Sequence, residues 1–492
     1  MVMAAAFAAK PRYVFLFIGD GMSTPQRMTA EEFSRSIGRG PLAMNALRFQ
    51  ATARTCSATS LITDSAAAAT AIACGEKTYN GASGVGTNRQ NLVSVAEVAH
   101  MAGKKVGLVT TVTINHATPA GFYAHRASRS LLYQIGLDLV ASGFEYFAGG
   151  GLRGGSDDRD DPLYRGNIYS LAAEAGYRVV RGGRDELMAI PADGGKAWYV
   201  GDEYTMQFDI DLRFEPQPSL AEMTSKGVEL LDGPAGFFMM VEGGKIDYAG
   251  HANDAATNLR DVLALDDAVR VAMDFDRRHP GETLVVVTGD HETGGMAMGF
   301  AGTGYAFHMD RLAHQKESCA HFEIWWEKQI AAALDSGRRP DFAPVRSRIE
   351  SSFGLVWPDK ASGRVDDAAA GDKFAAAGAG TAGEAMALSN KDCADLDKAF
   401  AADIDAAKKS RAAPPKKLPK YDITRSKGRP KLLTSLSETV RRIMSVKAGV
   451  GWTSGAHTAL PALTTSQGPG AETLTGLIDN TDLARRLKPL CE

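Results

Sequence analysis

Cysteine is scarce in this sequence, with five among 492 residues. An odd number leaves at least one thiol unpaired, and the spacing of the five is not that of a metal site, which excludes a cysteine metal cluster. If the protein is exported, Cys319 and Cys393 could pair. We expect Cys56 and Cys74 to be buried free thiols.

An excess of positive charge and long apolar runs are also missing. The net charge is −3, so no overall basic field attracts nucleic acid, and Pro415-Lys416-Lys417 is expected to be a solvated loop. No run approaches the roughly 18 apolar residues of a membrane span. Met1 to Lys10 is apolar but too short for a whole signal peptide, and it fits the end of a trimmed one or a frayed terminus equally well.

What is present is a globular composition with buried-strand patterns. Length allows one large α/β domain with insertions, or two or three domains. Continuous apolar runs at 13–18, 106–109, 237–241 and 284–287 are typical of parallel strands buried on both faces. Helical patterns such as 92–102 and 259–275 lie between them, and residues 156–235 are expected to complete the sheet. The sequence therefore predicts a doubly wound, mostly parallel α/β sheet flanked by helices.

A polar turn follows each of these four runs. The turns are Gly19-Asp20-Gly21, Thr110 onward to His116-Ala117-Thr118-Pro119, Glu242-Gly243-Gly244, and Thr288-Gly289-Asp290-His291. Ligands of such sheets bind beyond the carboxyl ends of the strands. We therefore expect the four turns to form one site.

Residues 63–71, Thr-Asp-Ser followed by a run of small residues, predict the start of a tightly packed helix. Asp64 is a natural N-cap for it, which taken alone is the more common meaning of the pattern. Ser65 would then face unpaired backbone N–H groups and the positive end of the helix dipole, where anions bind.

Several carboxylates and imidazoles have the spacing of metal ligands. Asp247 and His251 are four apart and share a helix face, although taken alone such a pair is more often a local ion pair or a cap. Asp290-His291 is a second such pair, and His457 lies among small polar residues. The histidine-rich part suggests zinc, whereas Asp20, Thr118 and Glu242 suggest magnesium.

Taken together, these motifs resemble the alkaline phosphatase family, over residues 12–298 and 452–475. The matching stretches, in family order, are Phe17-Ile18-Gly19-Asp20-Gly21-Met22, Thr63-Asp64-Ser65-Ala66-Ala67, His116-Ala117-Thr118-Pro119-Ala120, His125 through Arg129, Val241-Glu242-Gly243 with Ile246-Asp247 and His251, Thr288-Gly289-Asp290-His291-Glu292, and Gly455-Ala456-His457-Thr458.

The resemblance implies hydrolysis of phosphate monoesters through a phosphoserine at Ser65, with release of alcohol and phosphate or transfer to another alcohol. It implies two Zn²⁺ and one Mg²⁺, with Arg129 gripping two phosphate oxygens. Its ligand sets are Asp247, His251 and His457 for one zinc; Asp20, Asp290 and His291 for the other; and Asp20, Thr118 and Glu242 for magnesium.

Two positions depart from the enteric bacterial members of the family, which carry Asp and Lys where this chain has His116 and Tyr248. Loss of that lysine removes a positive charge near the phosphate. We expect weaker binding of product phosphate and a magnesium site that exchanges readily or accepts zinc. Together with Asp64, these two residues are expected to bind substrate or to lie behind the metal ligands; a packing role for Tyr248 is the alternative.

Residues 299–451 are predicted to be a large insertion, which folds over the site like a crown or lid, or makes a dimer contact. Its segment 366–413 is rich in Ala, Asp, Lys and Gly. His308, His314 and His321 open the insertion and are expected on a packed helix rather than at a metal. The core would comprise residues 1–298 and 452–492. Family habit implies a homodimer in the periplasm or outside the cell.

Three other functions compete with a monoesterase. A sulfatase uses a different nucleophile motif, and a phosphodiesterase of the same superfamily usually has threonine at the nucleophile and lacks the arginine and magnesium set. A phosphate- or metal-binding protein without turnover is the third alternative. Ser65, Arg129, Thr118 and Glu242 all favour the monoesterase.

Overall fold

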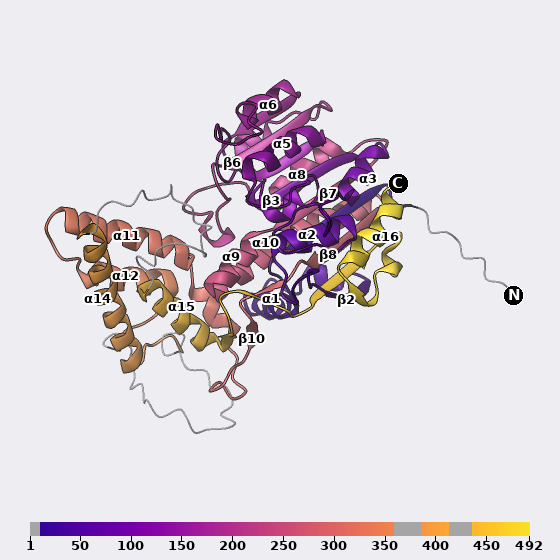
Figure 1. The fold of residues 1–492 in the computed structure, drawn as a ribbon. Coiled ribbons are helices and arrows are strands. Elements are labelled where there is room, and N and C mark those ends of the chain that lie inside the picture. The colour runs from indigo at the N-terminus through magenta and orange to yellow at the C-terminus, as the bar shows by residue number, and fades with distance from the viewer. Residues whose placement is uncertain (1–9, 359–384, 413–434) are drawn as a thin grey trace.

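The structure, a computed structural model, describes residues 10–358, 385–412 and 435–492. Its centre is a 10-stranded sheet of order β14-β2-β13-β8-β1-β7-β3-β4-β6-β5 (Figure 1). The strands are β1 (Tyr13–Gly19), β2 (Phe49–Arg54), β3 (Lys105–Thr113), β4 (Tyr146–Gly150), β5 (Tyr177–Arg181), β6 (Lys196–Asp202), β7 (Phe237–Gly243), β8 (Thr283–Gly289), β13 (Ala462–Gln467) and β14 (Gly476–Asp479).

The middle of the sheet is parallel, as predicted. β1 lies between β7 and β8, with Gly19 in register with Gly243 and Gly289, so the three strands end at one level. All four expected strands are present, and β5 and β6 extend the sheet from residues 156–235. The sheet is mixed rather than purely parallel, because β13 runs antiparallel to both β8 and β2. The predicted fold class is confirmed.

Helices cover both faces of this sheet (Figure 1). They are α1 (Thr24–Ser36), α2 (Ser65–Cys74), α3 (Val95–Met101), α4 (Ala117–Ala120), α5 (Leu132–Ser142), α6 (Ile168–Glu174), α7 (Arg184–Met188), α8 (Leu220–Leu231), α9 (Lys245–Ala252), α10 (Ala255–Arg278) and α16 (Thr481–Cys491), with short 3-10 turns η1 (Ala43–Ala46), η2 (Asp209–Asp211) and η4 (Ala471–Thr473). Side-chain caps set the starts of α3 and α10: Ser94 accepts from Glu97 N, and Asp254 accepts from Thr257 N.

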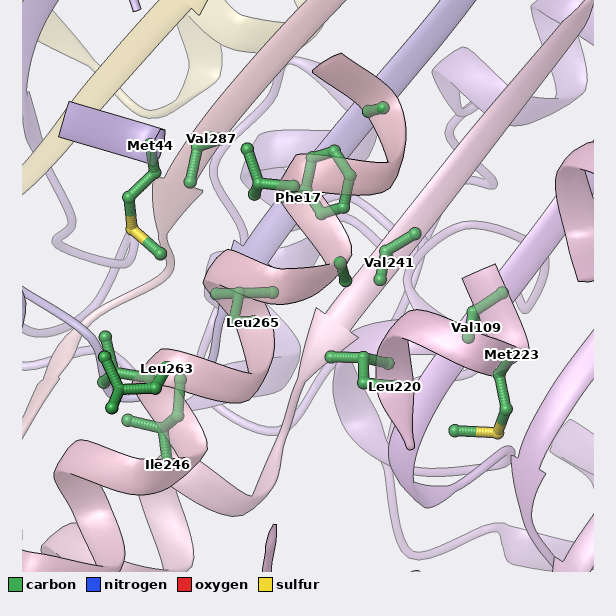
Figure 2. Packing of buried hydrophobic residues seen from close by; sticks show 14 of the residues in the cluster. Phe17, Met44, Val109, Leu220, Met223, Val241, Ile246, Leu263, Leu265 and Val287 are labelled. Atoms are coloured by element: carbon green, nitrogen blue, oxygen red, sulfur yellow. The ribbon is translucent and has the colours of Figure 1, made fainter. Parts of the chain in front are cut away.

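Alternating residues of each central strand enter two separate cores. Phe15 and Phe17 pack on the α8–α10 side, while Val14, Leu16 and Ile18 pack on the α2–α3 side. Figure 2 shows part of the first core, which includes Val241 and Val287 of the strands and Leu265 of α10. Each such buried side chain stabilises the fold by about 1.5–3 kcal/mol relative to exposure. The strand ends beneath the candidate site are therefore rigidly held.

The inserted region joins the core through a short two-stranded sheet. β10 (Met296–Met298) pairs antiparallel with β11 (Val450–Trp452), so the two ends of the insertion lie side by side. Beyond it lie η3 (Met309–His314), α11 (Cys319–Asp335), α12 (Phe342–Phe353), α14 (Asn390–Ala412) and α15 (Ser435–Ala448), grouped beside the sheet in Figure 1. α11, α12, α14 and α15 share a core of their own, which includes Phe322, Trp326 and Ile443, whereas Met309 and Leu312 of η3 pack into the first core of the sheet. The division at residues 299 and 451 stays a prediction.

Some sequence expectations concern residues outside the described ranges. The cluster Pro415-Lys416-Lys417 lies there, as do residues 1–9 and much of 366–413. All five cysteines are free thiols in the structure, so it contains no disulfide between Cys319 and Cys393. Cys74 is buried as expected, whereas Cys56 is only partly buried, because it sits in the polar segment between β2 and α2. No helix among the described residues is long and apolar enough to cross a bilayer.

The alanine run of α2 allows an unusually close approach to α4, the short helix that carries Thr118. A Cβ placed on Gly121 would lie 2.8 Å from Ala69 Cβ and 3.1 Å from the Ala69 carbonyl carbon. The backbone at Gly121 is ordinary right-handed helix, with φ −60°, so the constraint is one of space. Small residues on both helices therefore set the distance between Ser65 and Thr118.

We expect Gly121→Ala to lower the free energy of unfolding by about 1–3 kcal/mol, because the added methyl group meets backbone that has to move. The urea midpoint of the purified protein measures this. Gly233→Ala is the matched control, since its nearest contact would be at 3.9 Å. Equal midpoints for the two variants would show that the α2–α4 contact is not tight.

Candidate functional site

The polar turns expected to converge do so at the carboxyl ends of β1, β7 and β8. Asp20 follows β1, Glu242 lies near the end of β7, and Asp290 follows β8. The three carboxylates are fully buried. Buried charge is costly unless it is paired, so this arrangement needs compensating groups.

Ser65 is the first residue of α2, and Asp64 is its N-cap, as expected. The Asp64 side chain accepts from the backbone N–H of Ala67 at 3.0 Å, and the helix ends at Gly75 in the left-handed conformation. The Ser65 hydroxyl points into the site, where Oγ lies 3.1 Å from His291 Nε2. The N-cap interpretation of Asp64 is therefore confirmed, and the next residue, Ser65, faces the buried polar groups.

Asp20, Asp290 and His291 form one cluster, with ligand atoms within 4.8 Å of one another. His291 Nε2 lies 3.3 Å from Asp20 Oδ1 and 3.3 Å from Asp290 Oδ2. The other Asp290 oxygen accepts from the backbone N–H groups of Gly21 and His291. The backbone thus fixes Asp290 and leaves one oxygen facing the cluster.

Asp247, His251 and His457 form a second cluster of the same size. Asp247 and His251 lie on α9, and His457 comes from β12 (His457–Thr458), which pairs with β9 (Glu292–Thr293). His457 Nε2 lies 3.2 Å from His251 Nε2 and 3.5 Å from Asp247 Oδ1. The His457 ring also stacks on His291 at 3.7 Å between centroids, which brings the two clusters side by side.

A third cluster joins Asp20 and Glu242 to His116, again within 4.8 Å. Thr118 Oγ1 lies 3.5 Å from Asp20 Oδ2 in the same place. Sequence reasoning placed His116 at the phosphate or behind the ligands, whereas the structure puts its imidazole among them. A nitrogen donor suits zinc better than magnesium.

The protonation equilibria of these groups reflect crowding of negative charge. Burial raises the pKa of Asp20 well above its usual range, and the neighbouring Asp290 carboxylate raises it further. Burial likewise raises the pKa of Glu242 to about 8 and that of Asp290 to about 7. Burial also raises the pKa of Asp247, but the charges of His251 and His457 outweigh it and hold this pKa well below its usual range.

Unsatisfied oxygens show that the clusters fit cations. Asp20 Oδ1, Asp290 Oδ2 and Glu242 Oε1 are buried without a hydrogen-bond partner among the described residues. Each such atom costs about 1–3 kcal/mol when it is left unpaired. One cluster holds two imidazoles and a carboxylate, a donor set typical of zinc.

Arg129 reaches the rim of the site from the loop before α5. Its Nη1 donates to Asp64 Oδ2 at 3.1 Å, and its Nη2 lies 3.2 Å from His116 Nε2. Tyr248, on α9, has its ring edge-on to His116 at 6.0 Å between centroids. The buried Lys245 ammonium lies 5.2 Å from the Tyr248 ring centroid. The structure thus brings every residue expected at the site into one region.

Two supporting residues were missed from the sequence. Thr110 Oγ1 donates to Glu242 Oε2 at 2.5 Å, and Thr293 Oγ1 donates to Asp247 Oδ1 at 2.6 Å. Both hydroxyls orient a candidate ligand, a role that outer groups commonly have at metal sites. Their positions next to the motifs could have indicated this role, since Thr293 follows His291 by two residues.

Comparison with known proteins agrees with this geometry. The family model described as alkaline phosphatase matches residues 11–143 and 167–492. Alkaline phosphatase 3 of Bacillus subtilis is 30% identical over 442 residues, which cover 87% of this chain and 76% of that protein.

Two crystal structures share the fold. That of the alkaline phosphatase from Thermus thermophilus matches with a TM-score of 0.72 and 26% identity, over 98% of this chain and 91% of that one. That of a cold-active alkaline phosphatase from the psychrophile Shewanella sp. matches with a TM-score of 0.75 and 24% identity, over 98% of this chain and 100% of that one. The family match, the relative and the ligand clusters lead to one conclusion: this chain belongs to the alkaline phosphatase family, enzymes that hydrolyse phosphate monoesters.

Proposed function

We propose that Ser65 is the nucleophile of this hydrolysis and carries the phosphoryl group as a phosphoserine. The observation that supports this best is the position of Ser65 Oγ, 3.1 Å from His291 Nε2 in a cluster of buried carboxylates. The Oγ–P bond forms while the P–O bond to the alcohol breaks; Ser65 Oγ loses its proton to water, and the leaving oxygen takes up a proton to depart as the alcohol. Water then attacks the same phosphorus, which releases inorganic phosphate and restores the hydroxyl group.

Two Zn²⁺ and one Mg²⁺ are the proposed cofactors. Asp247, His251 and His457 would hold one zinc, and Asp20, Asp290 and His291 the other. Asp20, Glu242 and Thr118 would hold magnesium, and the His116 nitrogen beside them gives this site an affinity for zinc as well. Paired cations of this kind stabilise the entering and leaving oxygens of an in-line displacement.

The chain's own groups position the phosphate. Ser65 sits in the first turn of α2, where unpaired backbone N–H groups and the helix dipole favour an anion. The planar guanidinium of Arg129 can donate to two phosphate oxygens at once. Asp64 holds this guanidinium in place through Nη1. Phosphoryl transfer depends mainly on such positioning and charge stabilisation.

We also propose that the protein is exported to the periplasm or the medium and forms a homodimer. The support is membership of the alkaline phosphatase family, in which export and dimer formation are common. Cell fractionation tests the location, and light scattering from the purified chain tests the dimer.

We expect Ser65→Ala to reduce hydrolysis of p-nitrophenyl phosphate by at least about a thousandfold, because the covalent route loses its nucleophile. Acid quenching with ³²P-labelled substrate should trap label on the unaltered protein and none on the variant. The exposed Ser336→Ala is the control. Full activity of Ser65→Ala, or a preference for the bis-ester in the unaltered enzyme, would refute the proposed route.

Removal of metal should lower both activity and the thermal midpoint, because the buried carboxylates then repel one another without compensation. Dialysis against a chelator followed by calorimetry measures the midpoint, and added Zn²⁺ should restore both quantities. Chelator saturated with zinc beforehand is the control. A midpoint that does not move would contradict cation binding at these clusters.

Tyr248→Lys should tighten inhibition by inorganic phosphate roughly tenfold, the effect of one added charge-assisted hydrogen bond of about 1.5 kcal/mol. The inhibition constant from initial rates gives the answer. Tyr248→Phe keeps the ring beside His116 and serves as the control. If the lysine variant binds phosphate no better, Tyr248 acts through packing.

A further inference from the structure

A pocket of about 510 Å³ lies between α15 and β11, where the inserted region joins the core. Figure 1 shows α15 beside β10 at this junction. Its walls include Asn253, Phe300, Glu438, Arg441, Arg442 and Trp452. The volume is that of a site for a small organic ligand.

This pocket adjoins the cluster of Asp247, His251 and His457. Asn253 follows His251 by two residues, so their Cα atoms lie within about 8 Å of each other. The Asn253 amide can donate to Gly250 O and to Ser454 O, both at 2.9 Å, which ties this wall to the segment that leads to His457. His251 Nδ1 lies 2.8 Å from Gly455 O on the same segment. The wall and the cluster are therefore held together.

Two aromatic side chains in the pocket are fixed by glycines. The Trp452 ring lies against Gly294, where a Cβ would come within 2.5 Å of it, and its Nε1 donates to Ser445 Oγ at 3.3 Å. Phe300 packs on Gly451, where a Cβ would lie 2.9 Å from Phe300 Cβ. Both side chains line the pocket. They offer flat surfaces to a planar group.

The positive charge in the pocket comes from α15. The Arg442 guanidinium is bound by Asp395 at 2.8 Å. Arg441 is less well satisfied: within the described ranges its recorded ion pair is with Glu438, at the long distance of 3.6 Å. Since guanidinium has five donors, Arg441 retains hydrogen-bonding capacity toward the pocket, and it can also stack on an aromatic ring.

We propose that this pocket binds the base of a nucleoside monophosphate while its phosphate lies at Ser65. The proposal rests on the proposed function, in which Ser65 attacks beside the Asp20–Asp290–His291 cluster. In-line displacement sends the leaving oxygen to the opposite side of phosphorus, which we assign to the Asp247–His251–His457 cluster. The ribose spans from there to the pocket. The base meets Phe300 and Trp452, and its ring nitrogens and carbonyl oxygens accept from Arg441.

The test compares kcat/KM for adenosine 5′-monophosphate with kcat/KM for glycerol 2-phosphate, which has no base. Arg441→Ala should lower this ratio about tenfold, the effect of a lost hydrogen bond from a charged donor. Phe300→Ala should lower it as well, and provides a second variant if the first folds poorly. Arg277→Ala is the matched control, because Arg277 also pairs at i,i+3 but lies on α10 away from the pocket.

Equilibrium dialysis of adenosine, which carries no phosphate, separates this proposal from the catalytic one. The Ser65→Ala protein should bind adenosine, and the double variant with Arg441→Ala should bind it more weakly. That result supports binding of the base in the pocket even if no phosphoserine is trapped. An unchanged ratio in both pocket variants overturns the proposal, and so does adenosine binding that is indifferent to Arg441.

Discussion

Negative charge gathered in the protein interior is the constraint on which this site depends. Asp20, Glu242 and Asp290 are fully buried, and each leaves one oxygen without a hydrogen-bond partner among the described residues. Burial and mutual repulsion oppose their ionisation, as the raised pKa values show. Such an arrangement is stable only if positive charge compensates it. Imidazolium groups alone cannot supply that charge, because burial lowers the pKa of His291.

The parallel sheet brings these charges together and keeps them in place. β1, β7 and β8 end in register, so Asp20 meets Glu242 and Asp290 although it is more than two hundred positions from either in the sequence. The small residues of α2 let that helix approach α4 closely. Ser65, the first residue of α2, faces the His291 imidazole. Thr110 and Thr293 then orient Glu242 and Asp247 through short hydrogen bonds. The rigid core therefore fixes the positions of the side chains at the site.

The inserted helices have a different role from the core. They pack around a hydrophobic cluster of their own and reach the catalytic region through the β10–β11 pair and α15. In the proposed mechanism, the chemistry common to all phosphate monoesters takes place at the strand ends, where Ser65 faces the ligand clusters. Selection among alcohols belongs to the junction with the insertion, where Phe300, Trp452 and Arg441 line one pocket. Such a division lets one region vary without disturbing the other.

The sequence alone predicted the four central parallel strands and the start of α2, and its motifs indicated the candidate ligands other than the His116 imidazole. Buried parallel strands show as unbroken apolar runs, an N-cap has a local signature, and polar residues at strand ends converge for topological reasons. Side-chain packing decided the rest. Whether His116 lies behind the ligands or among them depends on a rotation that no spacing encodes. The antiparallel β13, the free Cys319 and Cys393, and a pocket assembled from residues 253, 300, 441 and 452 all depend on contacts between segments far apart in the chain. Local patterns carry no information about such contacts, so only the tertiary structure could establish them.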